Sequence, residues 1–308
     1  MNHYKNYSDY IKEHFDYKVQ KISINAGFTC PNRDGSIGVG GCTYCNNRSF
    51  NPDYCVSTTS VTKQLEEGKI FFRRKAKYAG LKFLAYFQAY TNTYGEFSRL
   101  KSLYEEALAC EDVVGLVIGT RPDCVDDKLL DYFQELSKEK YVMIEYGVES
   151  TDDNTLKRIN RGHDFACACK AIRNTASRGI QTGAHLILGL PGETPEMILK
   201  GADRMSELPI DIIKLHQLQI VRDTPMAEEY AKNPDEFKLF SIEAYQQLLA
   251  EFVEHLRADI CIERFVSQTP KSILVAPDWG LKNYEFTDRL NKIFEERGTI
   301  QGKFRIKN

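Results

Sequence analysis

The stretch FTCPNRDGSIGVGGCTYCNNRSF, residues 28–50, carries three of the nine cysteines in the chain. Eleven residues separate Cys30 from Cys42, and only two separate Cys42 from Cys45. The long spacer is rich in glycine, which gives the backbone enough freedom to fold back and bring the three thiols to one site. What that site holds depends on where the loop lies in the fold.

Around this stretch, short β-type runs alternate with helical patterns. Six such steps predict an α/β fold with a parallel sheet and outer helices, curved into a partial (β/α)6 TIM-like barrel. In such folds the chemistry gathers at the C-terminal ends of the strands, where the cysteine loop would lie. The expected strands are VQKISINAG (19–27), KFLAYFQAY (82–90), VVGLVIGT (113–120), YVMIEYGVES (141–150), QTGAHLILGLPGE (181–193) and IDIIKLHQLQI (210–220).

The chain divides into three expected parts. Residues 1–18 form an N-terminal extension, residues 19–225 the barrel core, and residues 226–308 a C-terminal α/β extension that we expect to pack on the core. In this extension the pattern predicts a helix over 241–258, a strand over 259–267 and an irregular tail with the only tryptophan, Trp279.

Composition limits the function. The 308 residues are 42% hydrophobic and 27% charged, with a net charge of −2, which excludes a generally basic protein that coats nucleic acid. Neither a signal peptide nor a long apolar run is evident, so we expect a cytoplasmic protein that is not bound to a membrane. In that reducing compartment, clustered cysteines indicate a metal or redox site rather than disulfides.

One local run, KIFFRRKAKYAGLK at residues 69–82, holds six Lys or Arg and no acid. It makes Arg73, Arg74 and Lys75 candidate contacts to RNA. A solvated helix face is the simpler interpretation of such a run, and both remain open.

Two kinds of metal site fit the cysteine loop. A structural zinc ion needs four closed ligands, and Cys55 could supply the fourth. A [4Fe–4S] cluster held by Cys30, Cys42 and Cys45 would instead leave one iron open to a cofactor or substrate. The position of the loop at the active edge of a barrel favours the cluster, and Tyr44, directly before the last cysteine, suits a cofactor that stacks beside it.

With these cysteines, Tyr44 and a partial barrel, the chain resembles the radical SAM superfamily. Its long first spacer and four further motifs are similar to the YhcC/YtqA-type subfamily, itself similar to the radical SAM part of the Elongator catalytic subunit. The resemblance covers roughly residues 1–300. The motifs are YFQAYTNTYG (86–95), IGTRPDC (118–124), IEYGVES (144–150) and LILGLPGE (186–193).

The resemblance implies the cofactors and the radical chemistry. S-adenosylmethionine (SAM) would bind the open iron, and an external one-electron donor such as flavodoxin or ferredoxin would reduce the cluster, so that SAM cleavage yields a 5′-deoxyadenosyl radical. The segment after the second strand stands where the family has a Gly-Gly-Glu sequence that meets the methionyl amine. Its candidate contacts here are Gln88, Tyr90 and Thr91.

Three further residues are implied as SAM contacts. Glu149 would hold the ribose hydroxyls, since a carboxylate accepts two hydrogen bonds well. Arg161 would pair with the cofactor carboxylate through its guanidinium fork, and His185 would lie near the ribose. A surface arginine and a buried core histidine are the simpler interpretations of the last two.

Lys214 and His216, on the sixth expected strand, must face the same side of the sheet, because side chains alternate with a period of two. If that side is the barrel interior, both are candidates for substrate binding. The sequence leaves the direction open.

The resemblance implies an enzyme that modifies tRNA. Its reaction would convert the 5-carboxymethylaminomethyl side chain of wobble (2-thio)uridine to 5-aminomethyl. Two alternatives remain: a radical SAM enzyme for a small metabolite or peptide, and a zinc-bearing RNA-binding module without catalysis.

Overall fold

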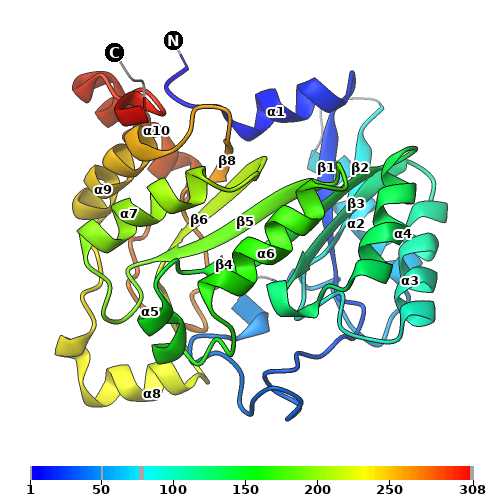
Figure 1. Ribbon diagram of the computed structural model, residues 1–308, viewed down its shortest axis with the longest axis horizontal. Helices are drawn as coiled ribbons and strands as arrows, with labels where there is room; N and C mark the ends of the chain where they lie inside the picture. Colours follow the sequence, from blue (N-terminus) through cyan, green and yellow to red (C-terminus); the bar gives the residue numbers. More distant parts are fainter. Residues whose placement is uncertain (1, 50, 76–79, 306–308) are drawn as a thin grey trace.

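The computed structural model describes residues 2–49, 51–75 and 80–305, without the side chain of Lys75. Seven parallel strands form one curved sheet in the order β1-β2-β3-β4-β5-β6-β8 (Figure 1). The partial barrel predicted from the sequence is thereby confirmed, with one strand added to the expected six. The strands are β1 Val19–Ile24, β2 Lys82–Phe87, β3 Val113–Thr120, β4 Tyr141–Glu149, β5 Gln181–Leu188, β6 Ile212–Gln217 and β8 Cys261–Arg264.

Helices cover the outer face of this sheet (Figure 1). Most of the longer helices bury an apolar stripe; in α3 the stripe is Leu100, Tyr104 and Ala107, spaced by four and three residues. Polar caps start several of the helices, and before α4 the Asp126 carboxylate accepts a hydrogen bond from Leu129 N at 2.8 Å. The helices are α2 Val61–Lys75, α3 Phe97–Ala109, α4 Asp127–Ser137, α5 Asp153–Arg158, α6 Phe165–Ala176, α7 Pro195–Ser206 and α9 Ile242–His255.

The interior of the barrel is closed at the amino ends of the strands. Helix α1, Tyr7–His14, lies across this end, opposite the cysteine loop (Figure 1), and Tyr10 Oη donates to Gln181 Oε1 at 2.6 Å. Its apolar side chains pack on a small inner core. The barrel interior is therefore open at the carboxyl ends of the strands. The inner core contains Tyr10, Ile11, Leu84, Tyr86, Val117, Met143, Ile212 and Cys261.

The C-terminal extension builds part of the barrel wall. Strand β8 pairs in parallel with β6 and is the seventh strand of the sheet. The expectation of an irregular tail is wrong over residues 283–297, because Phe286, Leu290 and Phe294 recur every four residues and are buried in helix α10. The other elements are β7 Ile220–Val221, β9 Leu274–Ala276, α8 Pro225–Lys232, α10 Asn283–Arg297 and the short 3-10 turns η1 Asn47–Ser49, η2 Pro122–Cys124, η3 Pro234–Glu236 and η4 Lys303–Arg305.

A membrane span was not expected. Within residues 2–49, 51–75 and 80–305, no helix has both the length and the apolar character needed to cross a bilayer.

Candidate active site

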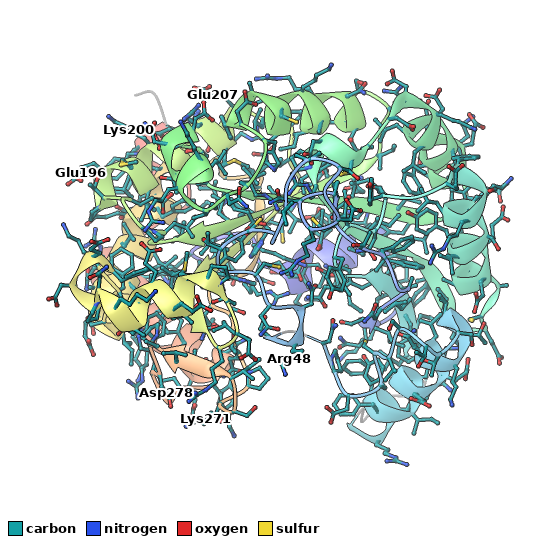
Figure 2. All side chains as sticks on the ribbon, turned by 90° about the horizontal axis from the view of Figure 1, so that it is seen from below. Arg48, Glu196, Lys200, Glu207, Lys271 and Asp278 are labelled. Carbon is teal, nitrogen blue, oxygen red and sulfur yellow. The ribbon has the colours of Figure 1, made fainter. Side chains whose placement is uncertain are left out.

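A cavity of about 250 Å³ lies at the carboxyl ends of the strands. Seen from this end, the cysteine loop lies across the opening of the curved sheet, with Arg48 near its edge (Figure 2). The structure brings to this one cavity all the candidate cluster and SAM residues, together with Lys214 and His216. The candidate residues that line it are Cys30, Cys42, Tyr44, Cys45, Gln88, Tyr90, Thr91, Glu149, Arg161, His185, Lys214 and His216.

Backbone contacts fix the cysteine loop in place. Arg33 Nη2 donates to Cys45 O at 2.7 Å, which ties the long spacer to the Cys-x-x-Cys turn. The turn after α5 holds the loop from the other side, since Asn160 Nδ2 donates to Gly41 O at 2.9 Å and Thr43 N donates to Ile159 O at 3.0 Å. The loop is thus anchored to the barrel rather than folded on its own.

Side-chain donors point at the sulfur atoms. Asn32 Nδ2 lies 3.8 Å from Cys42 Sγ, Asn47 Nδ2 lies 3.8 Å from Cys45 Sγ, and Arg161 Nη1 lies 3.5 Å from Cys42 Sγ. Donors of this kind stabilise thiolates and tune a bound cluster. The sequence analysis missed both asparagines, although each lies within two residues of a candidate ligand.

The cysteine arrangement does not support a zinc site completed by Cys55. Cys55 does not line the cavity; its thiol donates to Ser23 O at 2.9 Å, and burial raises its pKa to about 12. In the described part of the chain, no group of three or more His, Cys, Asp or Glu residues could hold a single metal ion. Three thiols around an open cavity fit a cluster with one exposed iron.

Glu149 ends β4 with a left-handed backbone, φ 68°, which is unusual for a residue with a side chain and typical of functional sites. Its Oε2 lies 3.1 Å from His185 Nδ1 and its Oε1 lies 3.6 Å from Arg161 Nη2. Burial alone would raise the pKa of this carboxyl, but His185 and Arg161 outweigh burial and lower the pKa to about 2. Glu149 is therefore ionised at neutral pH.

Arg161 joins this carboxylate to the cysteine loop. Besides Cys42 Sγ, its guanidinium reaches Gly147 O, with Nη2 at 2.5 Å. Its Nε is buried and has no hydrogen-bond partner among the described residues. A buried guanidinium with a spare donor beside the cluster cysteines fits a site for a cofactor carboxylate.

The segment after β2 braces the cysteine loop. Tyr90 has a left-handed backbone, φ 64°, and its N donates to Asn47 Oδ1 at 3.0 Å. Thr91 N donates to Thr29 O at 3.2 Å, and Gln88 Oε1 accepts from Ser23 Oγ at 2.9 Å. Tyr90 and Thr91 therefore position the loop as well as lining the cavity, whereas Gln88 is held by β1.

A ring of alternating charges lies at the base of the cavity, which two of its members, Glu145 and Lys214, line. Lys21 Nζ lies 2.9 Å from Glu145 Oε1 and 2.7 Å from Glu263 Oε2. Lys214 Nζ lies 2.7 Å from Glu145 Oε2 and 3.3 Å from Glu263 Oε1. We call Lys21, Glu145, Lys214 and Glu263 the charge ring; each lysine contacts both glutamates, so the four charges cancel.

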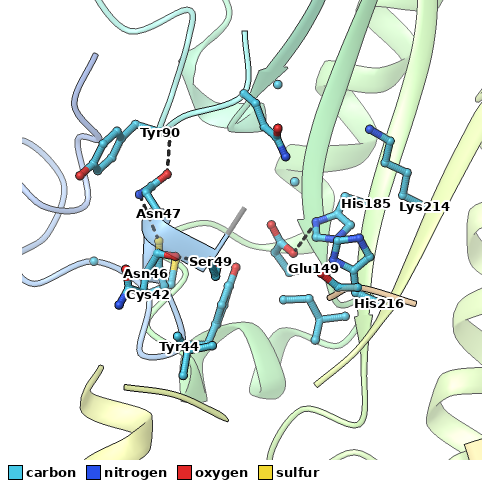
Figure 3. Close-up of a pocket in the computed structure, with 18 of the residues that line it drawn as sticks. Cys42, Tyr44, Asn46, Asn47, Ser49, Tyr90, Glu149, His185, Lys214 and His216 are labelled. Atoms are coloured by element: carbon cyan, nitrogen blue, oxygen red, sulfur yellow. Dashed lines mark hydrogen bonds and ion pairs between the residues drawn. The ribbon is translucent and has the colours of Figure 1, made fainter. Parts of the chain in front are cut away.

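Lys214 and His216 face the cavity, which answers the question of direction that the sequence left open. Burial lowers the pKa of Lys214 to about 8 even though two glutamates contact it. Burial, helped by His185, also lowers the pKa of His216, so its ring is neutral at neutral pH. Figure 3 shows Cys42 and Tyr44 across the cavity from Glu149, His185, His216 and Lys214.

Arg121 is a cavity residue that the sequence analysis did not single out. It is buried, and it pairs with Asp123 through Nε at 2.9 Å and Nη2 at 2.6 Å. Its buried Nη1 has no partner in the described structure. The signal was available, because the motif IGTRPDC places this arginine directly after a strand.

The RNA candidates of the basic run lie away from the cavity, on the outer helix α2. Arg73 Nη2 lies 2.5 Å from Asp112 Oδ2, so part of the charge of the run is paired. Arg74 is exposed, and the side chain of Lys75 lies outside the described residues. Contact with RNA through this helix stays a prediction.

A curved parallel sheet with a three-cysteine loop at its carboxyl edge, facing acidic and basic strand-end residues across one cavity, is the arrangement of a radical SAM enzyme. The family models agree: that of the radical SAM superfamily matches residues 26–205, and that of the radical SAM C-terminal domain matches residues 210–296. This chain belongs to the radical SAM superfamily, whose enzymes use a [4Fe–4S] cluster and SAM.

Several relatives match nearly the whole chain, among them one from Escherichia coli and one from Bacillus subtilis. Protein YhcC of Escherichia coli is 38% identical over 94% of this chain and 91% of its own length. YtqA of Bacillus subtilis is 35% identical over 96% of this chain and 90% of its own length. The resemblance to the YhcC/YtqA type is thereby confirmed.

More distant similarity leads to a tRNA uridine(34) acetyltransferase and to the structure of Elp3. The tRNA uridine(34) acetyltransferase of Methanocaldococcus infernus is 24% identical over 60% of this chain, which spans 34% of that protein. The solved archaeal Elp3 structure from the same organism has a TM-score of 0.67 at 17% identity, over 92% of this chain. The match spans 64% of that Elp3 chain, less than two thirds, and at this identity it shows a shared fold.

Proposed function

We propose that this protein is a tRNA-modifying radical SAM enzyme. It converts the 5-carboxymethylaminomethyl side chain of wobble (2-thio)uridine to 5-aminomethyl through a 5′-deoxyadenosyl radical. The observation that carries the proposal is the single cavity in which three cysteines and the candidate SAM contacts face a wall of charged and polar side chains. The side with the cysteines and the candidate SAM contacts suits the cofactors, and the side with the charged and polar residues suits a polar substrate.

The three cysteines, Cys30, Cys42 and Cys45, would hold the cluster. When bound, the cluster and SAM supply a carbon-centred radical that takes one hydrogen atom from the substrate carbon between the amine and the carboxylate. The substrate would then lose one further electron, which passes back to the cluster, and the N–H proton, so that an imine forms between the nitrogen and this carbon. Water would add to the imine and the C–N bond on the carboxylate side would break, so that the two-carbon unit leaves as glyoxylate and the nitrogen stays on the uridine as the aminomethyl group.

The protein side chains bind and orient the cofactor. The ionised Glu149 carboxylate would accept the ribose hydroxyls, while His185 and Arg161 hold it in place. Arg161 would offer its spare donor to the methionyl carboxylate, and Tyr44 would pack against the bound cofactor. Gln88, Tyr90 and Thr91 would surround the methionyl amine. The enclosed floor of the barrel would keep water and stray hydrogen donors from the radical.

The choice of tRNA rests on the relatives. The name of one similar protein, tRNA uridine(34) acetyltransferase, states that it acts on uridine 34, and the Elp3 structure shares this fold. For the body of the tRNA, we propose contacts through the basic run of α2, with Arg74 as its exposed, unpaired member in the described structure and with Arg73 and Lys75 as further candidates.

The nucleosides of cellular tRNA test the substrate. Deletion of the gene should make the carboxymethylaminomethyl nucleoside accumulate and the aminomethyl form disappear, as measured by mass spectrometry of digested tRNA. A plasmid copy should restore the aminomethyl form, whereas a Cys42→Ala copy should not. Identical nucleosides with and without the gene would overturn the substrate and leave the radical SAM assignment standing.

A further inference from the structure

Arg264 lies in the cavity wall beside Lys214, at the end of β8. The sequence analysis predicted a strand here but could not tell that it joins the barrel. In the structure, Arg264 is half-buried and its side chain lines the cavity.

A β-bulge turns this side chain inward. In the pairing of β6 with β8, Ile213 lies opposite Ile262 but Lys214 lies opposite Arg264, so Glu263 is an extra residue. Side chains normally alternate along a strand, and the bulge lets two consecutive residues reach the same face. Glu263 joins the charge ring, and Arg264 is directed to the cavity.

Arg264 carries the surplus charge of this wall. The charge ring is balanced, with two lysines and two glutamates in mutual contact. Across the described residues, the guanidinium of Arg264 makes no ion pair or hydrogen bond, although its charge helps to lower the pKa of the neighbouring Glu263 carboxyl, which the two lysines already contact. Lys214 cannot bind an anionic ligand in the same way, because its ammonium group already contacts two carboxylates.

Outside the charge ring, whose carboxylates are paired with lysines, the groups near Arg264 are polar but not acidic. Gln217 exchanges two hydrogen bonds with the backbone of Ser267, and Gln219 accepts from Thr269 Oγ1 at 2.9 Å. His216 is neutral, and its buried Nε2 has no partner among the described residues. In these surroundings the guanidinium of Arg264 is available to bind an anionic group that enters the cavity.

We propose that Arg264 binds the substrate carboxylate. This inference rests on the proposed function and identifies the carboxylate as the end of the carboxymethylaminomethyl side chain. A planar guanidinium binds a carboxylate through two parallel hydrogen bonds, which fixes orientation as well as position. Bound in this way, the carboxylate holds the adjacent carbon inside the cavity that also contains the candidate SAM contacts.

The test compares two anticodon stem-loop RNAs that differ in one group. One carries 5-carboxymethylaminomethyluridine at the wobble position, and the other carries the isosteric neutral carboxamide. Their dissociation constants are measured by fluorescence anisotropy with the cluster-loaded protein and SAM but without reductant. The variants are Arg264→Gln, Arg264→Lys and, as a matched control, Arg289→Gln on the exposed face of α10. Cluster absorbance monitors folding.

The wild-type protein should prefer the acid RNA by roughly tenfold or more, as expected for a charge-assisted pair. Arg264→Gln should remove this preference, Arg264→Lys should keep part of it, and Arg289→Gln should keep all of it. A preference that survives in Arg264→Gln would overturn the inference. If Arg264→Gln weakens the binding of both RNAs by the same factor, the inference is also overturned, because such a result would indicate that Arg264 binds a backbone phosphate.

Addition of reductant separates this inference from the proposed function. If the wild-type protein converts the acid RNA but binds both RNAs equally well, the role of Arg264 is overturned and the function stands. If the wild-type protein leaves the acid RNA unchanged, the proposed reaction is overturned, and with it the identity of the carboxylate.

Discussion

Gly147 lies beneath the Glu149 carboxylate and the Arg161 guanidinium, where any side chain would collide with both. A Cβ atom at this position would lie 2.5 Å from Glu149 Oε1 and 2.7 Å from Arg161 Nη2. Glycine therefore permits the close contact of the carboxylate and the guanidinium that the candidate SAM site requires.

Gly147→Ala should weaken SAM binding by roughly tenfold, because loss of an aligned charge-assisted contact costs about 1.5 kcal/mol. Equilibrium dialysis of SAM with the reconstituted protein measures this, and iron content should stay normal. Gly95→Ala is the control, since its Cβ would meet its neighbours at 3.8 Å, an ordinary contact distance. Equal SAM affinity in both variants would contradict the role given to Glu149 and Arg161.

At the residue scale, the sequence singled out candidate residues but not their protein partners. Glu149, Arg161 and His185 were each expected to contact SAM, which stays a prediction, and the structure adds that Glu149 contacts both Arg161 and His185. Arg264 could not be predicted, because its direction depends on a bulge in the pairing of two strands that are distant in sequence. Arg73 was a candidate contact to RNA, and its ion pair with Asp112 could not be predicted because the two residues are far apart in the sequence.

Among the elements, the ends of β4 and β5 are joined by Glu193 in the turn after β5. Its Oε1 accepts from Ser150 Oγ at 2.6 Å, and its Oε2 accepts from Gly189 N and Leu190 N. Burial raises the pKa of this carboxyl to about 7, even though the three donors oppose the shift. The turn is therefore most stable when Glu193 is protonated.

The sign of the pH dependence follows from this shift. The ordinary pKa is 4.5, so the folded state holds a proton that the unfolded state has lost between about pH 4.5 and 7. The free energy of unfolding should fall across this range, by up to about 3 kcal/mol. Glu193→Gln cannot ionise, so its stability relative to the wild type should increase between pH 5 and pH 7.5 in urea unfolding of the apoprotein. A difference that does not change with pH would contradict this account.

The basic helix α2 gives a test at the same scale. Arg74→Glu should lower tRNA affinity, and it should reduce the dependence of affinity on salt, because one phosphate contact is lost. Filter binding at several salt concentrations measures both quantities. Arg289→Glu is the matched control for net charge; if the two variants bind tRNA equally well, α2 is not part of the RNA surface. Arg73 is the poorer site for this test, since its substitution also breaks the pair with Asp112.

For the whole molecule, the charge ring ties the two edges of the open sheet together, because Lys21 on β1 contacts Glu263 on β8. Lys21→Met should destabilise the protein by roughly 3 kcal/mol, since it leaves two buried glutamates with a single lysine. The double variant Lys21→Met/Glu263→Gln should recover part of this loss. Urea unfolding of the apoprotein measures both, and a single variant as stable as the wild type would contradict a structural role of the ring.

The architecture followed from the sequence because six regular β/α steps leave few ways to arrange a parallel sheet. That the seventh strand joins the sheet could not be predicted, because β8 is short and two helices, α8 and α9, separate it from β6 in the sequence. The cysteine loop was placed correctly at the carboxyl edge for the same topological reason. Its supporting contacts from Asn32, Asn47 and Asn160 depend on the folded shape of an irregular loop, which no periodicity encodes.

The most direct test of the central claim is one anaerobic reaction that contains the reconstituted protein, SAM, a reductant and tRNA bearing 5-carboxymethylaminomethyl(2-thio)uridine. Nucleosides and SAM products are measured together by mass spectrometry. We predict that 5′-deoxyadenosine, methionine and the 5-aminomethyl nucleoside form in step, and that Cys42→Ala abolishes all three. Formation of 5′-deoxyadenosine with an unchanged tRNA side chain would contradict the proposed function.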